Sequence, residues 1–116
     1  MQAKIKNEIE KAILAHSRWK THLKEAITTG KSDFSVAIVW NSHLCEFGKW
    51  LDTVEAKTIP NYHEIVELHQ EFHKVAAKIL ELALSGKSEE ALSQMQLGSH
   101  FNQLTAKLVN KLAELT

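Results

Sequence analysis

The stretch TIPNYHEIVELHQEFHKVAAKILELALS, residues 58–85, carries two adjacent apolar rows. One row alternates spacings of 4 and 3 residues and comprises Tyr62, Val66, His69, His73, Ala76, Leu80 and Ala83. The row beside it comprises Ile65, Leu68, Phe72, Val75, Ile79 and Leu82. Such spacings place side chains on one face of an α-helix. Pro60 suits the first turn of a helix capped from Thr58. We therefore predict a helix that buries a wide face and stops at Gly86.

Two further stretches show a comparable helical pattern. Near the N-terminus, inward positions repeat every seven residues, at Ile5, Ile9, Ala12, His16, Trp19, Leu23 and Ala26. This helix is expected to end at Gly30, which can adopt the left-handed cap conformation. A last helix is predicted to start at Ser88. Its expected inward residues are Leu97, Phe101, Leu104, Leu108, Leu112 and Leu115.

The segment between these helices, about residues 32–57, is the least regular part of the chain. Ser32 or Asp33 can cap a short apolar helix through Val39. A break follows at residues 40–43, and then a turn or helix that carries Cys45 to Val54. The sequence thus predicts an all-α fold, an antiparallel four-helix bundle with a short irregular segment carrying the cysteine. We expect one domain over residues 1–116.

Composition limits the classes of partner and compartment. Fourteen Lys and Arg residues balance fourteen Asp and Glu residues, which argues against a general affinity for nucleic acid or anionic lipid. No run approaches the roughly 20 apolar residues of a membrane-spanning helix, and the N-terminus lacks the apolar core of a signal peptide. A single cysteine cannot form an internal disulfide, which fits a reducing compartment. We expect a soluble, cytoplasmic protein without membrane insertion.

Three histidines, His16, His69 and His73, occupy predicted inward positions where a core leucine would be ordinary. His69 and His73 form an i, i+4 pair, about 6 Å apart along one helix face. A buried imidazole without a partner costs of order 1–3 kcal/mol, so three of them in a small core favour a shared partner. With the thiolate of Cys45 they would complete a closed tetrahedral shell of the kind that zinc takes.

The remaining histidines fit this site less well. Three of them lie off the inward faces or lack a partner in sequence: His22, His63 and His100. His43 is the one competitor, since it lies two residues before Cys45 and a flexible break could bring it close. Trp19 and Phe72 are interpreted as core packing, with a secondary role as a dry wall around the metal.

Cys45 alone could be a simple buried thiol, because free cysteine is often buried. Its neighbours suggest more. Gly48 lets a backbone approach closely, and the aromatic residues Phe47 and Trp50 can fix the turn against the bundle.

Taken in order, these residues match a known pattern. It runs His16-x-x-Trp19, 25 residues, Cys45-x-Phe47-Gly48-x-Trp50, 18 residues, His69-x-x-x-His73. The pattern resembles the chemoreceptor zinc-binding (CZB) family of bacterial signalling proteins. The resemblance implies a four-helix bundle that binds one Zn²⁺ per chain. Carried over by position, the ligands are His16, Cys45, His69 and His73.

The resemblance also implies a role in signalling rather than an enzyme. Such domains lie at the C-terminus of cytoplasmic chemoreceptors or the N-terminus of diguanylate cyclases, and some stand alone. They are associated with sensing of zinc and of oxidants such as hypochlorous acid, and they often form homodimers. This sequence shows neither a receptor signalling hairpin nor a cyclase domain, so its output would lie in a domain in cis or in a partner protein.

The expected mechanism is a redox switch in which Cys45 is oxidised or displaced while the three histidines hold the ion. Three alternatives compete with it. A zinc hydrolase would have water in place of the thiolate and would need a general base near the metal. A hemerythrin-like di-iron bundle would need bridging carboxylates on the inward rows of the helices. A structural or partner-binding bundle without metal needs only the inward apolar rows of the helices. In a further version, zinc stabilises a structural or dimerisation bundle that has no sensory role.

Overall fold

The computed structural model describes residues 3–116, and these residues form helices and connecting turns without a strand. The α-helices are α1 (Ala3–Ser17), α2 (Trp19–Thr29), α3 (Val36–Trp40), α4 (Glu46–Leu51), α5 (Tyr62–Leu84), α6 (Ser88–Ser93) and α7 (His100–Ala113). Two 3₁₀ turns are η1 (Ser42–Leu44) and η2 (Ala56–Thr58). The predicted all-α class is confirmed. The predicted domain begins at Met1, and so does the N-terminal segment that lacks a signal-peptide core. The first two residues of both lie outside the described residues.

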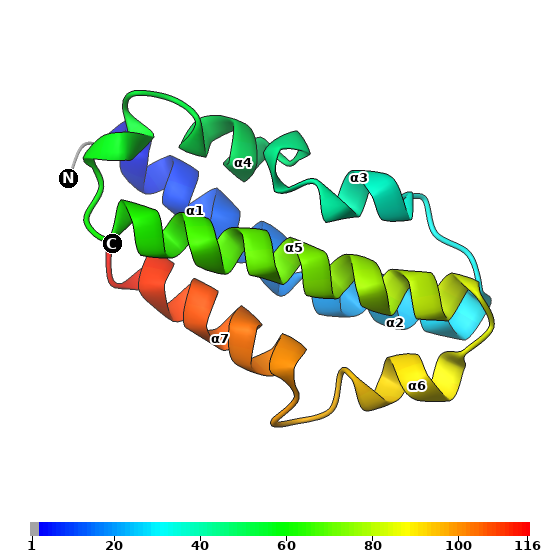
Figure 1. Cartoon of the computed structure of the whole chain (residues 1–116). Helices are drawn as coiled ribbons and strands as arrows, with labels where there is room; N and C mark the ends of the chain where they lie inside the picture. The colour runs from blue at the N-terminus through cyan, green and yellow to red at the C-terminus, as the bar shows by residue number, and fades with distance from the viewer. Residues whose placement is uncertain (1–2) are drawn as a thin grey trace.

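The chain runs along the long axis of the molecule four times, and successive passes run in opposite directions (Figure 1). The first pass is α1 and α2, the second is α3, η1 and α4, the third is α5, and the last is α6 and α7. Helix α5 packs against α2, α3 and α7, and α1 packs against α7. This arrangement is compatible with the expected antiparallel four-helix bundle, although three of its passes are divided into shorter helices.

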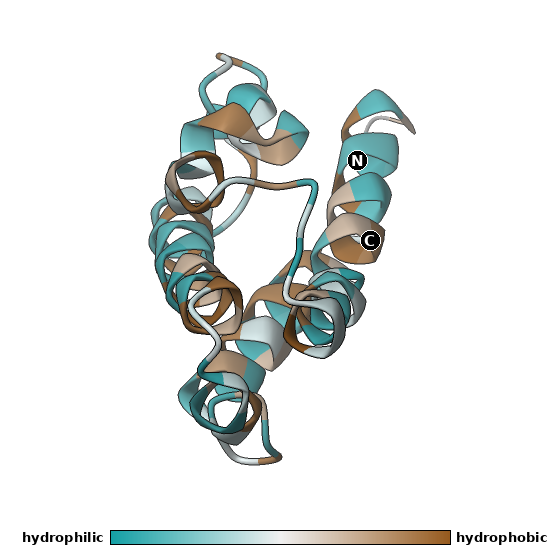
Figure 2. Ribbon diagram, turned by 90° about the vertical axis from the view of Figure 1, so that its right-hand side faces the viewer, coloured by the Kyte–Doolittle hydropathy of each residue, from teal (hydrophilic) through white to brown (hydrophobic). Residues whose placement is uncertain are grey.

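The first pass is interrupted at Arg18, but its inward face continues across the break. The buried residues of this face are Ile5, Ile9, Ala12, His16, Leu23 and Ala26. Helix α2 ends as predicted, because Gly30 has a φ of 72° and its N–H donates to the carbonyl oxygen of Ala26. The long helices carry hydrophobic and hydrophilic residues side by side, which is visible in the end-on view of Figure 2 and is typical of helices around a shared core.

Helix α5 begins at Tyr62 and its N-cap is Asn61, three residues later than the predicted cap at Thr58. The prediction was wrong because a residue before proline avoids the α conformation, and Ile59 is extended with a ψ of 148°. Asn61 then turns the chain with a φ of 59°. At the other end the helix stops as expected, where Gly86 has a φ of 80°. The wide buried face of α5 is also confirmed, with Ile65, His69, Phe72, His73, Ala76, Ala77, Ile79, Leu80 and Ala83 buried.

Two other expectations were wrong in detail. Leu97, predicted to point inward, is 95% exposed, because α6 ends at Ser93 and the chain forms a loop before α7. The hydroxyl of Ser99 restarts the helix by accepting the N–H of Asn102. Ser35, rather than Ser32 or Asp33, caps α3 by accepting the N–H of Ile38. Among residues 3–116, no helix combines the length and apolar character that crossing a bilayer requires.

Candidate metal centre

His16 reaches the core from the last turn of α1. Its side chain is 2% exposed, and its Nδ1 lies 2.7 Å from the carbonyl oxygen of Ala12, one turn earlier. A neutral imidazole carries one N–H, so Nδ1 donates to this carbonyl and Nε2 keeps a free lone pair. The helix itself therefore fixes the ring orientation and the tautomer of His16.

His69 and His73 lie one turn apart on the buried face of α5, with ring centroids 4.5 Å apart. Nδ1 of His73 lies 2.9 Å from the carbonyl oxygen of Val39 at the end of α3, so it donates there and Nε2 is again the free nitrogen. That Nε2 atom is buried and has no hydrogen-bond partner among residues 3–116. A buried nitrogen lone pair without a partner is costly, and it is the group that a metal ion would satisfy.

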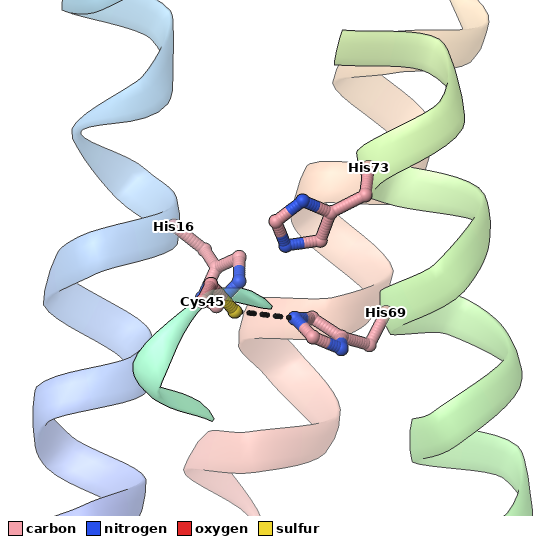
Figure 3. A group of neighbouring side chains, drawn as sticks. All are labelled: His16, Cys45, His69 and His73. Atoms are coloured by element: carbon pink, nitrogen blue, oxygen red, sulfur yellow. Dashed lines mark hydrogen bonds between the residues drawn. The ribbon is translucent and has the colours of Figure 1, made fainter. Parts of the chain in front are cut away.

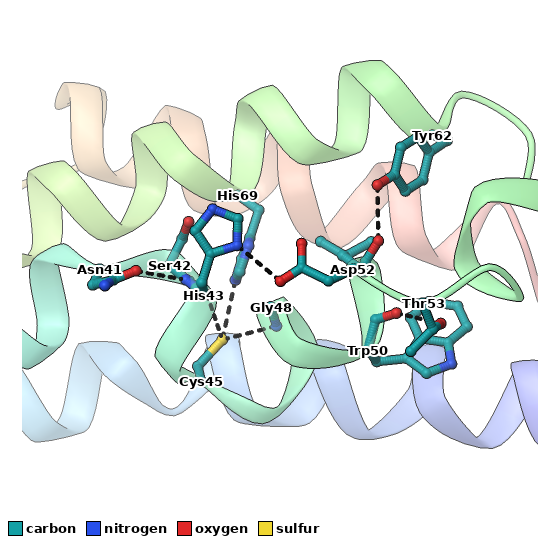
Figure 4. A network of polar contacts seen from close by, with 11 residues as sticks. Asn41, Ser42, His43, Cys45, Gly48, Trp50, Asp52, Thr53, Tyr62 and His69 are labelled. Atoms are coloured by element: carbon teal, nitrogen blue, oxygen red, sulfur yellow. Dashed lines mark hydrogen bonds and ion pairs between the residues drawn. The ribbon is translucent and has the colours of Figure 1, made fainter.

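Cys45 comes from the second pass of the bundle, at the N-cap position of α4. Its Sγ lies 3.2 Å from Nε2 of His69 and accepts the backbone N–H of Gly48 at 3.3 Å. The same sulfur lies 3.5 Å from the carbonyl oxygen of Ser42 (Figure 4). Unlike the three histidines, the cysteine is only half-buried.

Gly48 allows this turn to close. A Cβ atom on Gly48 would lie 1.7 Å from the carbonyl oxygen of Ser42, which is a backbone atom and cannot rotate away. The expectation of a close backbone approach at this glycine is therefore confirmed. The contact holds η1 against α4, and this places the sulfur of Cys45 over His69.

The four side chains, His16, Cys45, His69 and His73, point toward one another (Figure 3). One ligand atom from each lies within 4.8 Å of the others. A tetrahedral zinc site with bonds of about 2.0–2.3 Å places neighbouring ligand atoms roughly 3.3–3.8 Å apart, so small side-chain movements would close this cluster around one ion. The donor set and the unpartnered nitrogen of His73 fit a metal that binds imidazole and thiolate.

Burial gives the histidines the protonation state that a metal requires. Desolvation lowers the pKa of His16 to about 4 and, together with the neighbouring His16 and His73, lowers that of His69 to about 2. The pKa of His73 is also lowered by burial. All three rings are thus neutral near pH 7 and can offer a lone pair. Burial raises the pKa of the Cys45 thiol, so without a metal this sulfur keeps its proton.

Two phenylalanines enclose the cluster. The ring centroid of Phe47 lies 5.1 Å from that of His69, and the centroid of Phe72 lies 5.2 Å from that of His16. Phe72 therefore lies where the sequence predicted an apolar side chain that keeps water away from the metal. Trp19 is half-buried and packs against Phe34, with centroids 5.0 Å apart, at the edge of the site.

His43, the predicted competitor, lies outside the cluster. Its ring is exposed, and Nδ1 lies 3.0 Å from a carboxylate oxygen of Asp52 (Figure 4). The other three histidines also lie elsewhere: His22, His63 and His100. The cluster contains no Asp or Glu side chain, whereas a di-iron bundle needs bridging carboxylates.

Sequence reasoning missed the backbone groups that orient the ligands. The carbonyl oxygens of Ala12 and Val39 fix two imidazoles, and that of Ser42 packs against Gly48. Backbone carbonyls leave no signal in the residue types. The contact within α1 could have been inferred from the i, i−4 spacing of a helix, but the one between α3 and α5 depends on tertiary packing.

The family model of the chemoreceptor zinc-binding domain matches residues 16–80. The chain belongs to this family. The matched range begins at His16 and includes Cys45, His69 and His73, so the four clustered residues all lie within it. The resemblance inferred from the motif is therefore confirmed. Searches among curated proteins and among solved structures gave no significant match.

Proposed function

We propose that residues 1–116 form one zinc-binding domain, which holds one Zn²⁺ ion through His16, Cys45, His69 and His73. The convergence of these four ligand atoms within 4.8 Å carries the proposal. Imidazole and thiolate donors in a four-coordinate shell favour zinc over the hard cations Mg²⁺ and Ca²⁺, which prefer oxygen ligands. The CZB match supports the same metal.

The domain acts in this proposal as a sensor or regulator in cytoplasmic signalling and not as an enzyme. Bound Zn²⁺ would keep the Cys45 thiol deprotonated at neutral pH. His16 and His73 are fixed by backbone carbonyls, and His69 lies on the longest helix. Cys45 is the half-buried member on a segment of short helices. It is therefore the residue best placed to respond to a stimulus.

Two stimuli would act on the same residues. A change in zinc concentration would fill or empty the cluster. An oxidant would act on the thiolate. With hydrogen peroxide, the sulfur of Cys45 attacks one oxygen, the O–O bond breaks and hydroxide leaves, so the cysteine is oxidised to a sulfenic acid and the peroxide is reduced. Hypochlorous acid would oxidise the same sulfur.

Either event changes how the segment α3–α4 is held against α1 and α5. The Val39 carbonyl is tied to His73 and the Cys45 sulfur lies against His69, so both ends of η1 depend on the histidine pair of α5. A shift of this segment is the local event that a homodimer interface, an output domain in cis of the receptor or cyclase type, or a signalling partner protein would read.

A second candidate function is a zinc-stabilised structural or dimerisation bundle without a sensory role. The deep burial of three ligands on α1 and α5 favours it, because such a metal would join two helices permanently. The two functions differ in their response to oxidant. A sensor should lose one free thiol and change its circular dichroism or oligomeric state after about one equivalent of hypochlorous acid per chain, and a reductant should reverse the change.

The zinc proposal is tested by elemental analysis of the purified chain and by unfolding with and without a strong chelator. We expect one zinc per chain. Chelation should lower the free energy of unfolding by about 4 kcal/mol if zinc is present at roughly a thousand times its Kd, which corresponds to a fall in Tm of about 15 °C. The absence of zinc together with an unchanged Tm would contradict the proposal. His63→Ala is a matched control variant, since this histidine is exposed on α5. It should hold one zinc per chain and show the same fall in Tm on chelation.

A further inference from the structure

A groove of about 190 Å³ opens from the surface onto the cysteine, between α1 and the start of α4. Helix α1 contributes Glu8, Lys11 and His16 to its walls, and the other side contributes Cys45 and Glu46. His16 is 2% exposed and Cys45 is half-buried. Of the four clustered residues, Cys45 is therefore the one that solvent reaches most easily, and the groove is the way to it.

The opposite side of the cluster offers a much smaller opening. This second hollow, between η1 and α5, is about 20 Å³ and is lined by His43, Gly48 and His69 among others. That volume is close to the space one water molecule needs. A reagent larger than water would have to displace side chains there. The groove beside α1 is the open route.

The charges along the groove are predominantly negative. Glu8 and Lys11 form an ion pair at 3.9 Å, in which the Glu8 side chain is 27% exposed and the Lys11 side chain is 68% exposed. Both side chains line the groove, and that of Lys11 is the more exposed of the two. Glu46 follows Cys45 directly and is exposed. Lys11 offsets part of the Glu8 charge, and the two carboxylates with this one cation leave a net charge of −1 along the groove.

We propose that this groove is the route by which solutes reach the Cys45 sulfur, and that Glu8 and Glu46 make it selective for uncharged and cationic species over anions. The inference rests on the proposed function in taking Cys45 as the reactive thiol. The selectivity itself does not require a bound metal. Uncharged oxidants such as hydrogen peroxide and hypochlorous acid, and divalent cations, would be admitted in preference to anionic oxidants such as hypochlorite.

The physical reason is Coulombic. Opposite unit charges a few ångströms apart attract appreciably even in water, and the interaction grows where protein replaces part of the solvent. A groove bounded by low-dielectric walls focuses such a field toward its inner end. An anion approaching Cys45 passes both carboxylates, and a cation is drawn by them. Salt at 1 M reduces the screening distance to about 3 Å, which should abolish most of the discrimination.

The experiment is a labelling-rate comparison on the chain as purified, which has a single cysteine. Two methanethiosulfonates are used, one bearing an ethyltrimethylammonium group and one an ethylsulfonate group. In both, the Cys45 sulfur forms a disulfide bond with the reagent's sulfenyl sulfur, and methanesulfinate leaves with the electron pair of the broken S–S bond. The labelling rate of each reagent is followed by intact mass. It is divided by the rate of the same reagent with the same chain unfolded in urea, which cancels the intrinsic reactivity of the reagent.

We expect the normalised cation-to-anion rate ratio of the folded chain to be about fivefold or more at low salt and to approach one at 1 M salt. Glu8→Gln and Glu46→Gln should each reduce the ratio about twofold or more, chiefly by accelerating the anionic reagent. Glu10→Gln is the matched control. This residue also lies on α1, pairs with Lys6 at 3.9 Å and is absent from the groove lining, so its substitution should leave the ratio unchanged.

A normalised ratio near one at low salt, or an equal effect of Glu10→Gln, would overturn the proposal. Labelling with uncharged iodoacetamide measures any change in thiol reactivity that is common to all reagents. Its rate should stay constant in Glu8→Gln and Glu10→Gln, where a rise would mark a variant that has merely loosened. In Glu46→Gln it should rise, because Glu46 contributes to the raised pKa of the Cys45 thiol, and this rise cancels in the cation-to-anion ratio. Zinc content is measured on the same samples. A chain without zinc that still discriminates between the reagents would contradict the proposed function and leave the groove assignment standing. A chain that holds one zinc but does not discriminate would overturn the groove assignment and leave the proposed function standing.

Discussion

The two sides of the metal centre are built differently. His16, His69 and His73 come from α1 and α5, helices of 15 and 23 residues, and all three are buried. Cys45 comes from a pass made of α3, η1 and α4, none longer than 6 residues, and it is half-buried. Long, well-packed helices resist local opening, whereas short segments open more easily. The histidine side is therefore the anchor and the cysteine side is the part that can respond.

Acid should affect the histidine side most strongly. In the unfolded chain the imidazoles bind protons near pH 6.5, whereas in the folded chain His16 does so only near pH 4 and His69 near pH 2. Between these values the unfolded state holds more protons than the folded state. The stabilisation that the neutral histidines provide is therefore fully present above about pH 6.5 and is lost as the pH falls below it. Each such histidine contributes up to about 1.4 kcal/mol per pH unit.

For the metal-free chain, His16 and His69 amount to a loss of about 2.5 kcal/mol between pH 7 and pH 5.5, and the lowered pKa of His73 adds to it in the same direction. Urea unfolding of chelated protein at a series of pH values measures it. Because Cys45 has a raised pKa, no comparable loss is expected from this residue in the same range. Constant stability from pH 7 to pH 5 would mean that the imidazoles are not held neutral in the core.

Removing one ligand from each side should separate their contributions to zinc affinity. His69→Ala breaks the chelating pair on α5, and we expect its affinity loss to exceed 100-fold, since even the residues that orient zinc ligands are worth 10–100-fold. Cys45→Ala should cost less, because three histidines on two stable helices remain. Competition titration against a zinc indicator dye gives both values. Equal and negligible losses would refute the assignment of these ligands.

The turn at Gly48 can be tested without touching a ligand. Gly48→Ala places a methyl group against the carbonyl oxygen of Ser42, so η1 and α4 must separate and the sulfur of Cys45 must move. We expect a 10–100-fold loss of zinc affinity and about 1–3 kcal/mol of stability. The matched control is Gly86→Ala, which has open space but a φ of 80°. Gly86→Ala should cost about 1 kcal/mol of stability and leave zinc affinity unchanged. An equal loss of zinc affinity in Gly48→Ala and Gly86→Ala would show that Gly48 has no special role.

The smallest effect is expected from His43, which lies beside the cysteine segment but outside the cluster. Its ion pair with Asp52 is exposed on both sides, and exposed pairs contribute little. His43→Gln should change the free energy of unfolding by less than about 0.5 kcal/mol and leave zinc affinity within about twofold. A tenfold loss of affinity in the same dye competition would make His43 a ligand.

The sequence predicted the histidine side better than the cysteine side, and the reason is physical. Helical periodicity over long stretches fixes which residues face inward, so the inward positions of His16, His69 and His73 followed from spacing alone. No such period exists around Cys45. Its place came from the CxFGxW motif, and the contact between Gly48 and Ser42 that makes the motif necessary is tertiary.

The misplaced elements have the same origin. Leu97 was predicted to begin an apolar row that continues on α7, but Gly98, with a φ of 82°, lies in the loop before this helix and separates Leu97 from the rest of the row. The start of α5 moved because the backbone restriction before Pro60 outweighed its preference for a first helical turn. In both cases a local backbone conformation decided where the helix begins.

X-ray absorption at the zinc edge of the purified chain addresses the metal centre most directly. It reports the number and type of ligand atoms without any substitution. We predict one zinc per chain in a four-coordinate shell of three nitrogen atoms at about 2.0–2.1 Å and one sulfur atom at about 2.3 Å. A shell of nitrogen and oxygen without sulfur, or less than stoichiometric zinc in a fully folded chain, would contradict the assignment of Cys45 and the three histidines as its ligands.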